Sequence, residues 1–170
     1  MMILRQALSI AILPFTVTVL VPLWIARSKG IGLALGSSPA EVALETFGVI
    51  LLLIGLRLFA ASLTRFAVEG KGTLAPWDPP RHLVIRGPYR YVRNPMISGV
   101  SFVLFGEAAV LLSSSHLQWA LIFLTANLVF IPLWEEPDLK RRFGTEYEDY
   151  CRNVRRLVPR LRPWVPPPPP

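Results

Sequence analysis

The stretch NPMISGVSFVLFGEAAVLLSSSHLQWALIFLTANLVFIPLW, residues 94–134, decides the fold class. Its only ionisable residues are Glu107 and His116, and three consecutive serines at 113–115 divide it into two apolar runs. Each run is about long enough to form a helix that crosses the hydrocarbon core of a bilayer. The pattern therefore predicts a tight helical hairpin of two membrane spans, 95–112 and 117–134.

Two further apolar runs precede this hairpin. Residues 6–26 carry no charge and lie between Arg5 and Arg27, and residues 42–64 follow a helix-start cluster of Ser37, Ser38 and Pro39. A cleaved signal peptide is the alternative for the first run, but that run is long for a signal sequence and no small-x-small cleavage site closes it. We therefore expect four spans in all.

The composition agrees with a membrane protein. Of the 170 residues, 52% are hydrophobic and 17% are charged, whereas soluble domains average about 25% charged residues. The single Cys151 excludes an internal disulfide, and the two histidines are far apart, so we expect no metal site. We expect an all-α, polytopic helical bundle formed by one domain, residues 1–165.

The basic residues predict the orientation of the spans. Six of the 18 Lys and Arg residues lie in 65–93 and eight in 135–170. The positive-inside rule places both segments on the cytoplasmic side, and the serine-rich turn on the opposite side.

The segment 135–159 carries an apolar stripe at helical spacing. Its members are Leu139, Phe143, Tyr147, Tyr150, Val154 and Leu157. This pattern predicts a cytoplasmic amphipathic helix, which we interpret as lying against anionic lipid headgroups. Five prolines, 166–170, follow as an extended, disordered tail.

The connector 81–99 contains many side chains that stack or form hydrogen bonds, in the sequence HLVIRGPYRYVRNPMISG from His82. Tyr89 and Tyr91 are suited to stacking on a planar ring, and Arg90 and Arg93 to holding a carboxylate. The alternative is that these arginines only anchor the chain at the membrane surface. Because Asn94 precedes a proline, we expect the third span to begin at Pro95.

Glu135 and Glu136 form a second polar feature, at the end of the fourth span. Two carboxylates beside a bilayer need water, a cation or hydrogen-bond donors. One interpretation is that they are acidic residues in the first turn of a new helix, because Pro137 follows them. The other is that one of them binds hydroxyl groups or an ammonium group of a ligand.

Together, GPYRYVRNPM at 87–96 and EExxLxxxFGxEYxxY at 135–150 resemble the motifs of the isoprenylcysteine carboxyl methyltransferase family. That family is related to the membrane phospholipid N-methyltransferases. The resemblance implies an enzyme that binds S-adenosylmethionine (SAM) between the connector and the C-terminal segment. It implies cofactor contacts from His82, Leu83, Val84, Tyr89, Arg90, Asn94, Pro95, Met96, Ile97, Glu135 and Glu136.

The sequence departs from the family pattern at three positions. Asn94 stands where the family has histidine, Ile97 where it has tyrosine, and Ile131 where it has an arginine that contacts prenylcysteine. The Asn-Pro-Met and Glu-Glu-Pro triplets also resemble the animal phosphatidylethanolamine methyltransferases. The resemblance thus implies SAM binding and leaves a lipid carboxylate or a phospholipid amine as the acceptor.

We therefore expect methyl transfer from SAM to a lipophilic acceptor, with Arg93, Glu107 and Glu135 as the candidate catalytic residues. Arg57 and Glu107 lie within predicted spans, where they either pair with each other or line the acceptor cleft. The expected location is the inner (plasma) membrane of a bacterium or archaeon, with the cofactor site on the cytoplasmic face. The expected partners are membrane lipids, and neither nucleic acid nor a metal; the oligomeric state stays open.

Two other functions remain compatible with the sequence. One is an NADPH-dependent membrane reductase resembling the sterol reductases, which share an Arg-x-x-Arg-x-Pro pattern but are usually longer. The other is a non-enzymatic membrane scaffold whose basic loops bind anionic lipid.

Overall fold

A computed structural model describes residues 11–33, 35–70 and 82–165. The proline tail, residues 6–10 of the first predicted span and residue 81 of the connector lie outside the described residues. Within the described residues every regular element is a helix. In chain order these are η1 (Ala11–Leu20), α2 (Val21–Lys29), α3 (Pro39–Arg65), η2 (Phe66–Gly70), η3 (Gly87–Arg90), α4 (Pro95–Val110), α5 (Ser114–Phe130), η4 (Ile131–Glu135) and α6 (Glu136–Asn153).

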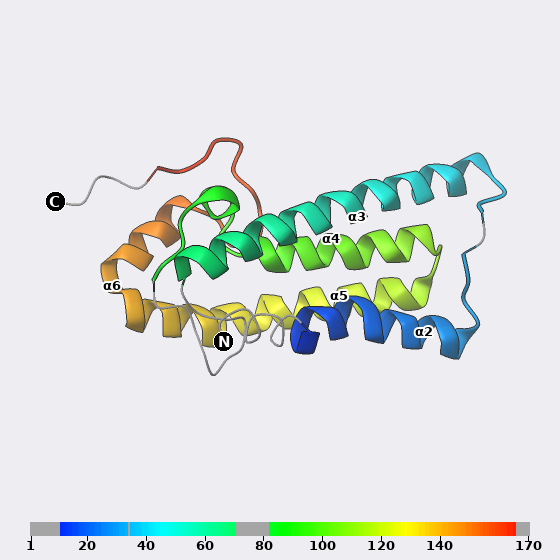
Figure 1. Cartoon of the computed structure of the whole chain (residues 1–170), viewed down its shortest axis with the longest axis horizontal. Coiled ribbons are helices and arrows are strands. Elements are labelled where there is room, and N and C mark those ends of the chain that lie inside the picture. The colour runs from blue at the N-terminus through cyan, green and yellow to red at the C-terminus, as the bar shows by residue number, and fades with distance from the viewer. Residues whose placement is uncertain (1–10, 34, 71–81, 166–170) are drawn as a thin grey trace.

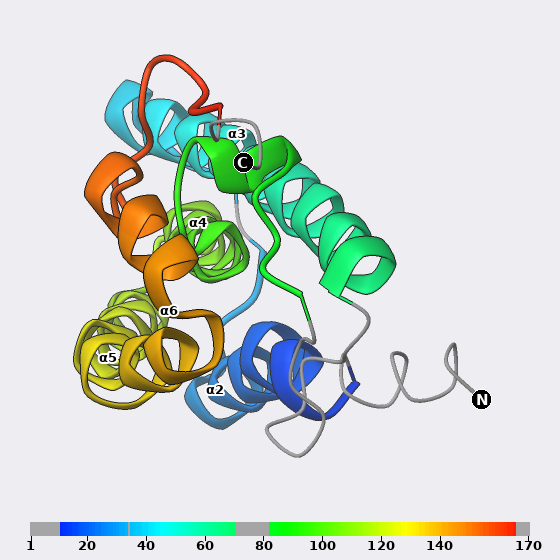
Figure 2. The ribbon, with the colours of Figure 1, turned by 90° about the vertical axis from the view of Figure 1, so that its left-hand side faces the viewer.

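Four helices, α2, α3, α4 and α5, run side by side along the long axis of the molecule (Figure 1). Seen from one end, α4 lies between α3 and α5 (Figure 2). The connector, α6 and the residues that follow it gather at one end of the bundle, and the α4–α5 turn lies at the other. The described parts of the two basic segments, which the sequence predicts on one side of the membrane, are therefore neighbours in space.

Two helical runs among the described residues are long and apolar enough to cross a membrane, Pro39–Glu69 and Ser114–Asn153. A third apolar helix, Pro95–Val110, is shorter. The 40 residues of the second run would extend about 60 Å if straight, twice the thickness of a hydrocarbon core. A hydrocarbon core would therefore accommodate only about half of this run, and we expect that half to be its apolar part, 114–134. The four-span count stays a prediction.

Helix α3 begins at Pro39, within the predicted helix-start cluster, and it carries a reciprocal cap. The Ser38 hydroxyl accepts a hydrogen bond from the Glu41 amide at 3.3 Å, and the Glu41 carboxylate accepts one from the Ser38 amide at 3.2 Å. Pro39 occupies the first turn, where its missing amide hydrogen costs nothing. Helix α4 likewise begins at Pro95, as predicted.

Small residues join α3 to α4. Gly48 and Gly55 on α3 meet Gly106 and Gly99 on α4, and Ser62 continues the series on α3 with no exposed surface. A Cβ atom added at Gly55 would lie 2.7 Å from the Gly99 carbonyl oxygen. The two backbones can approach this closely only because side chains are absent at these positions. Close packing at small residues is a common mode of helix association in membranes.

This contact decides where Arg57 points, and it overturns one of our interpretations. Arg57 follows Gly55 by two residues, which rotates it by about 200° around the helix and away from α4. Its side chain is exposed, and it forms no ion pair with Glu107, although the structure describes both residues. The expected Arg57–Glu107 pair is therefore wrong.

The α4–α5 turn is made by Leu112 and closed by a buried histidine. Leu112 adopts a positive φ of 45°. Ser113 is the N-cap of α5, and Ser114 and Ser115 form the first turn of that helix. The His116 ring lies 2.8 Å from the Ser113 hydroxyl and 3.1 Å from the Pro22 carbonyl oxygen. His116 thus ties α2 to the turn.

Helices α5, η4 and α6 form one continuous run, so Glu135 and Glu136 do not open a new helix. Glu135 itself has helical backbone angles. The run bends at Gly144, whose φ of 55° and ψ of −131° are non-helical. This bend turns the second half of α6 back over the connector (Figure 2).

The apolar stripe on α6 is present, but its partner differs from our interpretation. Tyr147, Tyr150 and Val154 are buried and form a cluster with Ile85 of the connector, against which Leu139 and Phe143 pack. Most of the stripe therefore packs against protein, which the interpretation of lipid-headgroup contact did not include. An amphipathic pattern predicts a buried face without indicating what covers it.

Candidate functional site

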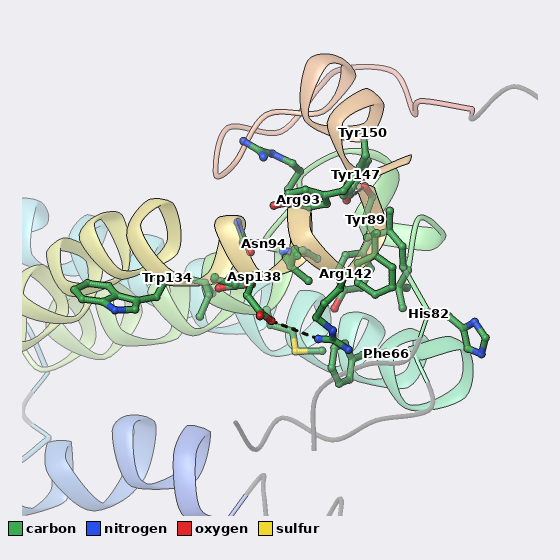
Figure 3. A pocket seen from close by; sticks show the side chains of 18 of the residues that line it. Phe66, His82, Tyr89, Arg93, Asn94, Trp134, Asp138, Arg142, Tyr147 and Tyr150 are labelled. Carbon is green, nitrogen blue, oxygen red and sulfur yellow. Dashed lines mark hydrogen bonds and ion pairs between the residues drawn. The ribbon is translucent and has the colours of Figure 1, made fainter. Parts of the chain in front are cut away.

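A pocket of about 470 Å³ lies at the end of the bundle, between the connector, the α5–α6 run and the end of α3 (Figure 3). It is lined by residues that lie far apart in the chain. These are Phe66, His82, Leu83, Val84, Tyr89, Arg93, Asn94, Pro95, Met96, Ile97, Phe130, Trp134, Glu135, Asp138, Leu139, Arg142, Phe143, Tyr147 and Tyr150.

Most of the predicted cofactor contacts meet in this pocket. Of the eleven residues proposed from the sequence, all but Arg90 and Glu136 line it. His82 lies at its rim, with its exposed ring pointing away from the other labelled side chains (Figure 3). The role of these predicted residues in binding a cofactor stays a prediction.

Tyr89 is held by its backbone. It lies in the short helix η3, which Gly87 enters with a φ of 56°. Its carbonyl oxygen accepts a hydrogen bond of 2.6 Å from the Tyr150 hydroxyl. Its side chain is 8% exposed, and burial, with smaller effects of Tyr150 and Glu135, raises the pKa of Tyr89 well above its usual range. The Tyr150 hydrogen bond thus fixes the Tyr89 backbone in the pocket wall.

Glu135 is one of the two carboxylate residues that line the pocket, with Asp138. Burial is the main cause that raises its pKa to about 7, the negative charge of Glu136 adds to this, and Arg93 opposes it. Among the described residues, none donates a hydrogen bond to this carboxylate. Glu135 therefore keeps its hydrogen-bonding capacity for a ligand.

Glu136 faces away from the pocket and belongs to an ion network. Its carboxylate accepts two hydrogen bonds from Arg156, at 2.8 and 2.7 Å, and lies 3.0 Å from an Arg93 nitrogen. Burial alone would raise the pKa of Glu136. The Arg156 hydrogen bond and the Arg93 charge outweigh burial and hold this pKa below its usual value. The guanidinium of Arg93 also contacts the Cys151 sulfur, so only part of Arg93 faces the pocket.

Residues 154–165, which we call the C-terminal strap, fix the connector from outside. The bonds that join the two are Arg93 N to Arg155 O (2.9 Å), Asn94 N to Arg156 O (3.1 Å), Arg160 N to Tyr91 O (2.9 Å) and Trp164 N to Arg90 O (2.9 Å). The Arg90 side chain donates to the Trp164 carbonyl at 2.7 Å. Arg90 thus supports the pocket wall without lining the pocket. Tyr91 does not line the pocket either.

Glu107 lies outside this pocket. It is half-buried on α4, and one of its carboxylate oxygens is buried without a hydrogen-bond partner among the described residues. The structure therefore does not bring the three candidate catalytic residues together: Arg93 and Glu135 line the pocket, and Glu107 does not.

Nine lining residues were not predicted as site residues. Four of them, Leu139, Phe143, Tyr147 and Tyr150, belong to the apolar stripe that we assigned to lipid contact. Phe130 and Trp134 stack with ring centroids 5.8 Å apart, and with Phe66 they add aromatic surface to the pocket. The one-turn spacing of Asp138 and Arg142 on α6 is a signal that could have identified this pair.

A sequence profile of the phospholipid methyltransferase family matches residues 44–146, which include most of α3, the connector, Glu135 and most of α6. The chain belongs to the phospholipid methyltransferase family. This confirms the predicted relationship, and with the two long apolar helices it indicates an integral membrane protein of a methyltransferase family.

Two curated proteins are similar to this phospholipid methyltransferase family member. Methanethiol S-methyltransferase 2 of Bradyrhizobium diazoefficiens is 41% identical over 73 residues, which are 43% of this chain and 27% of that protein. Methanethiol S-methyltransferase of Mycobacterium tuberculosis is 37% identical over 71 residues, 42% of this chain and 28% of that protein. The chain thus spans just over a quarter of the length of these relatives. No solved structure matches it.

Proposed function

We propose that this protein transfers a methyl group from SAM to a lipophilic acceptor at the cytoplasmic face of a bacterial or archaeal plasma membrane. The observation that carries the proposal is that Tyr89 of the connector and Glu135 of the α5–α6 run line one pocket at the end of an apolar bundle. A polar cofactor and an acceptor from the bilayer can meet only at such a boundary.

The pocket suits a nucleoside cofactor in size and in chemistry. Its volume of about 470 Å³ lies within the range of roughly 300–1,000 Å³ that is usual for small-molecule sites. Glu135 supplies a carboxylate for ribose hydroxyl groups or an ammonium group. Tyr89 and Tyr147 supply aromatic surface for a planar base.

SAM supplies an electrophilic methyl group on a positively charged sulfur. The contribution of the protein is to hold the acceptor in line with that methyl group and to keep water out. An amine or a thiol must lose its proton before it is methylated, whereas a carboxylate need not. Glu135, whose pKa is about 7, is suited to accept that proton near neutral pH.

Phe66, Phe130 and Trp134 form the apolar side of the pocket. Phe130 and Trp134 belong to the run that also carries Glu135, so an apolar acceptor that contacts them lies beside the carboxylate. The names of the two relatives add a small thiol to the lipid carboxylate and the phospholipid amine as acceptor classes.

The test is to incubate the purified protein, in lipid nanodiscs, with methyl-labelled SAM and three acceptors in parallel. These are phosphatidylethanolamine, a prenylated cysteine and methanethiol. We expect the label in one of them, and less of it with the Glu135→Gln variant. Absence of labelling together with absence of binding of the demethylated product, S-adenosylhomocysteine (SAH), would overturn the proposal. Saturable binding of NADPH in place of SAH would favour a reductase.

A further inference from the structure

Within the pocket, a carboxylate and a guanidinium lie next to each other on the same face of one helix. Asp138 and Arg142 are one turn apart on α6, and both line the pocket. Figure 3 shows their charged groups pointing toward each other, and the closest nitrogen and oxygen atoms are 3.6 Å apart.

This separation is too long for a good hydrogen bond. Partly exposed ion pairs contribute about 0–1 kcal/mol, and the Arg142 guanidinium also lies 5.3 Å from the centre of the Phe143 ring, another lining residue. An arginine guanidinium matches the geometry of a carboxylate or a phosphate, and an aspartate accepts hydrogen bonds from an ammonium group. The pair can therefore receive one positive and one negative group at the same time.

The position of the pair relative to Glu135 supports this role. Asp138 and Arg142 follow Glu135 by three and seven residues, so all three lie along one face of the helical run. The distance along the axis from Glu135 to Arg142 is about 10 Å. An elongated ligand with its hydroxyl groups at Glu135 would thus place a charged end near the pair.

We propose that Asp138 and Arg142 bind the zwitterionic part of a ligand, Asp138 its ammonium group and Arg142 its carboxylate or phosphate. This inference rests on the proposed function. Two ligands of the reaction carry such a group: the amino-acid end of SAM, and the headgroup of a zwitterionic phospholipid acceptor.

Arg141 provides a matched control. It also pairs with Asp138, at 3.2 Å, but its side chain is 77% exposed and it does not line the pocket. The Arg141→Gln variant removes the same charge and a partner of the same aspartate, so it separates a general effect of charge from a role within the pocket.

The experiment measures the binding of SAH and of 5′-methylthioadenosine, which lacks the amino-acid end, by calorimetry in detergent. If the pair binds that end, Arg142→Gln and Asp138→Asn weaken SAH binding about tenfold, which corresponds to one charge-assisted hydrogen bond. Binding of methylthioadenosine changes less than about twofold in all variants, and Arg141→Gln binds both ligands as the wild type does. Thermal unfolding checks that each variant is folded.

If SAH binding is unchanged, the second arm measures KM for phosphatidylethanolamine in nanodiscs. A rise in KM in the Arg142 and Asp138 variants, with unchanged KM for the uncharged acceptor methanethiol, assigns the pair to a lipid headgroup. The inference is overturned if neither arm responds, or if Arg141→Gln has the same effect as Arg142→Gln. Failure of the wild type to bind SAH would instead overturn the proposed function, and this inference with it.

Discussion

Glu135 and Glu136 are adjacent in the chain, yet they belong to different environments. The Glu135 carboxylate lines the pocket, whereas the Glu136 carboxylate is held by Arg156 at 2.8 and 2.7 Å behind the pocket wall. Consecutive residues on a helix point about 100° apart, so one of the two can serve a ligand while the other supports the wall.

Neutralising each glutamate in turn should therefore give different results. We expect Glu135→Gln to weaken SAH binding about tenfold without a large change in thermal stability. We expect Glu136→Gln to lower stability by about 2–3 kcal/mol, because it leaves Arg156 and the partly buried Arg93 without their carboxylate. Calorimetry and thermal unfolding of both variants measure this contrast, and equal effects of the two on binding would contradict it.

The affinity for SAH should depend on pH through Glu135. With a pKa of about 7, this carboxyl is mostly protonated at pH 6 and must lose its proton to accept hydrogen bonds at both oxygens. Binding should therefore strengthen as the pH rises through 7, by up to about tenfold per pH unit below the pKa. Titrations at several pH values measure the slope. The same slope in Glu135→Gln would show that another group is responsible.

The close approach of α3 and α4 should not tolerate a methyl group. A Cβ atom at Gly99 would lie 2.9 Å from the Gly55 carbonyl oxygen, so we expect Gly99→Ala to destabilise the protein by about 1–3 kcal/mol. Thermal unfolding in detergent measures the loss. Gly32→Ala is the control, since no atom lies within 4 Å of its added Cβ, and equal stability of the two variants would refute the argument.

The C-terminal strap should be needed for a well-formed pocket wall. The Trp164 ring lies 5.8 Å from that of Tyr150, and its backbone bonds to Arg90 at 2.9 Å. We expect Trp164→Ala to cost about 2 kcal/mol and to weaken SAH binding, because Tyr89 loses support. Leu161 lies in the same strap and is fully exposed, so Leu161→Ala should behave as the wild type. Wild-type binding by Trp164→Ala would show that the strap has no effect on the site.

The two histidines should differ in their effect on stability. His116 is 2% exposed and connects Ser113 to the Pro22 carbonyl, so we expect His116→Leu to cost about 1–3 kcal/mol by leaving buried polar groups unpaired. His82 is exposed, and His82→Leu should leave the unfolding temperature within a degree or two. Similar losses in both variants would contradict the structural role of His116.

Local sequence signals predicted the helices and much of the pocket. The cluster of Ser37, Ser38 and Pro39 and the later Pro95 predicted two helix starts, because each signal acts within a single turn. Tyr89 and Glu135 were predicted from two motifs and not from their contact, since nothing along the chain measures the distance between them in space.

Other features depend on contacts between distant segments, and these escaped prediction. The side of α3 that faces α4 is set by Gly48 and Gly55, so the direction of Arg57 could not be read from its depth alone. The bend at Gly144 turns Tyr147 and Tyr150 inward onto the connector. Periodicity identified their shared face but not the surface that covers it.

The most direct test of the account is a calorimetric titration of SAH into the wild type, Tyr89→Ala, Glu135→Ala and Leu161→Ala in one detergent. The account predicts saturable binding by the wild type and Leu161→Ala, and at least about tenfold weaker binding by the other two. Absence of binding by the wild type, or equal affinity in all four, would show that the connector and the α5–α6 run do not form one cofactor site.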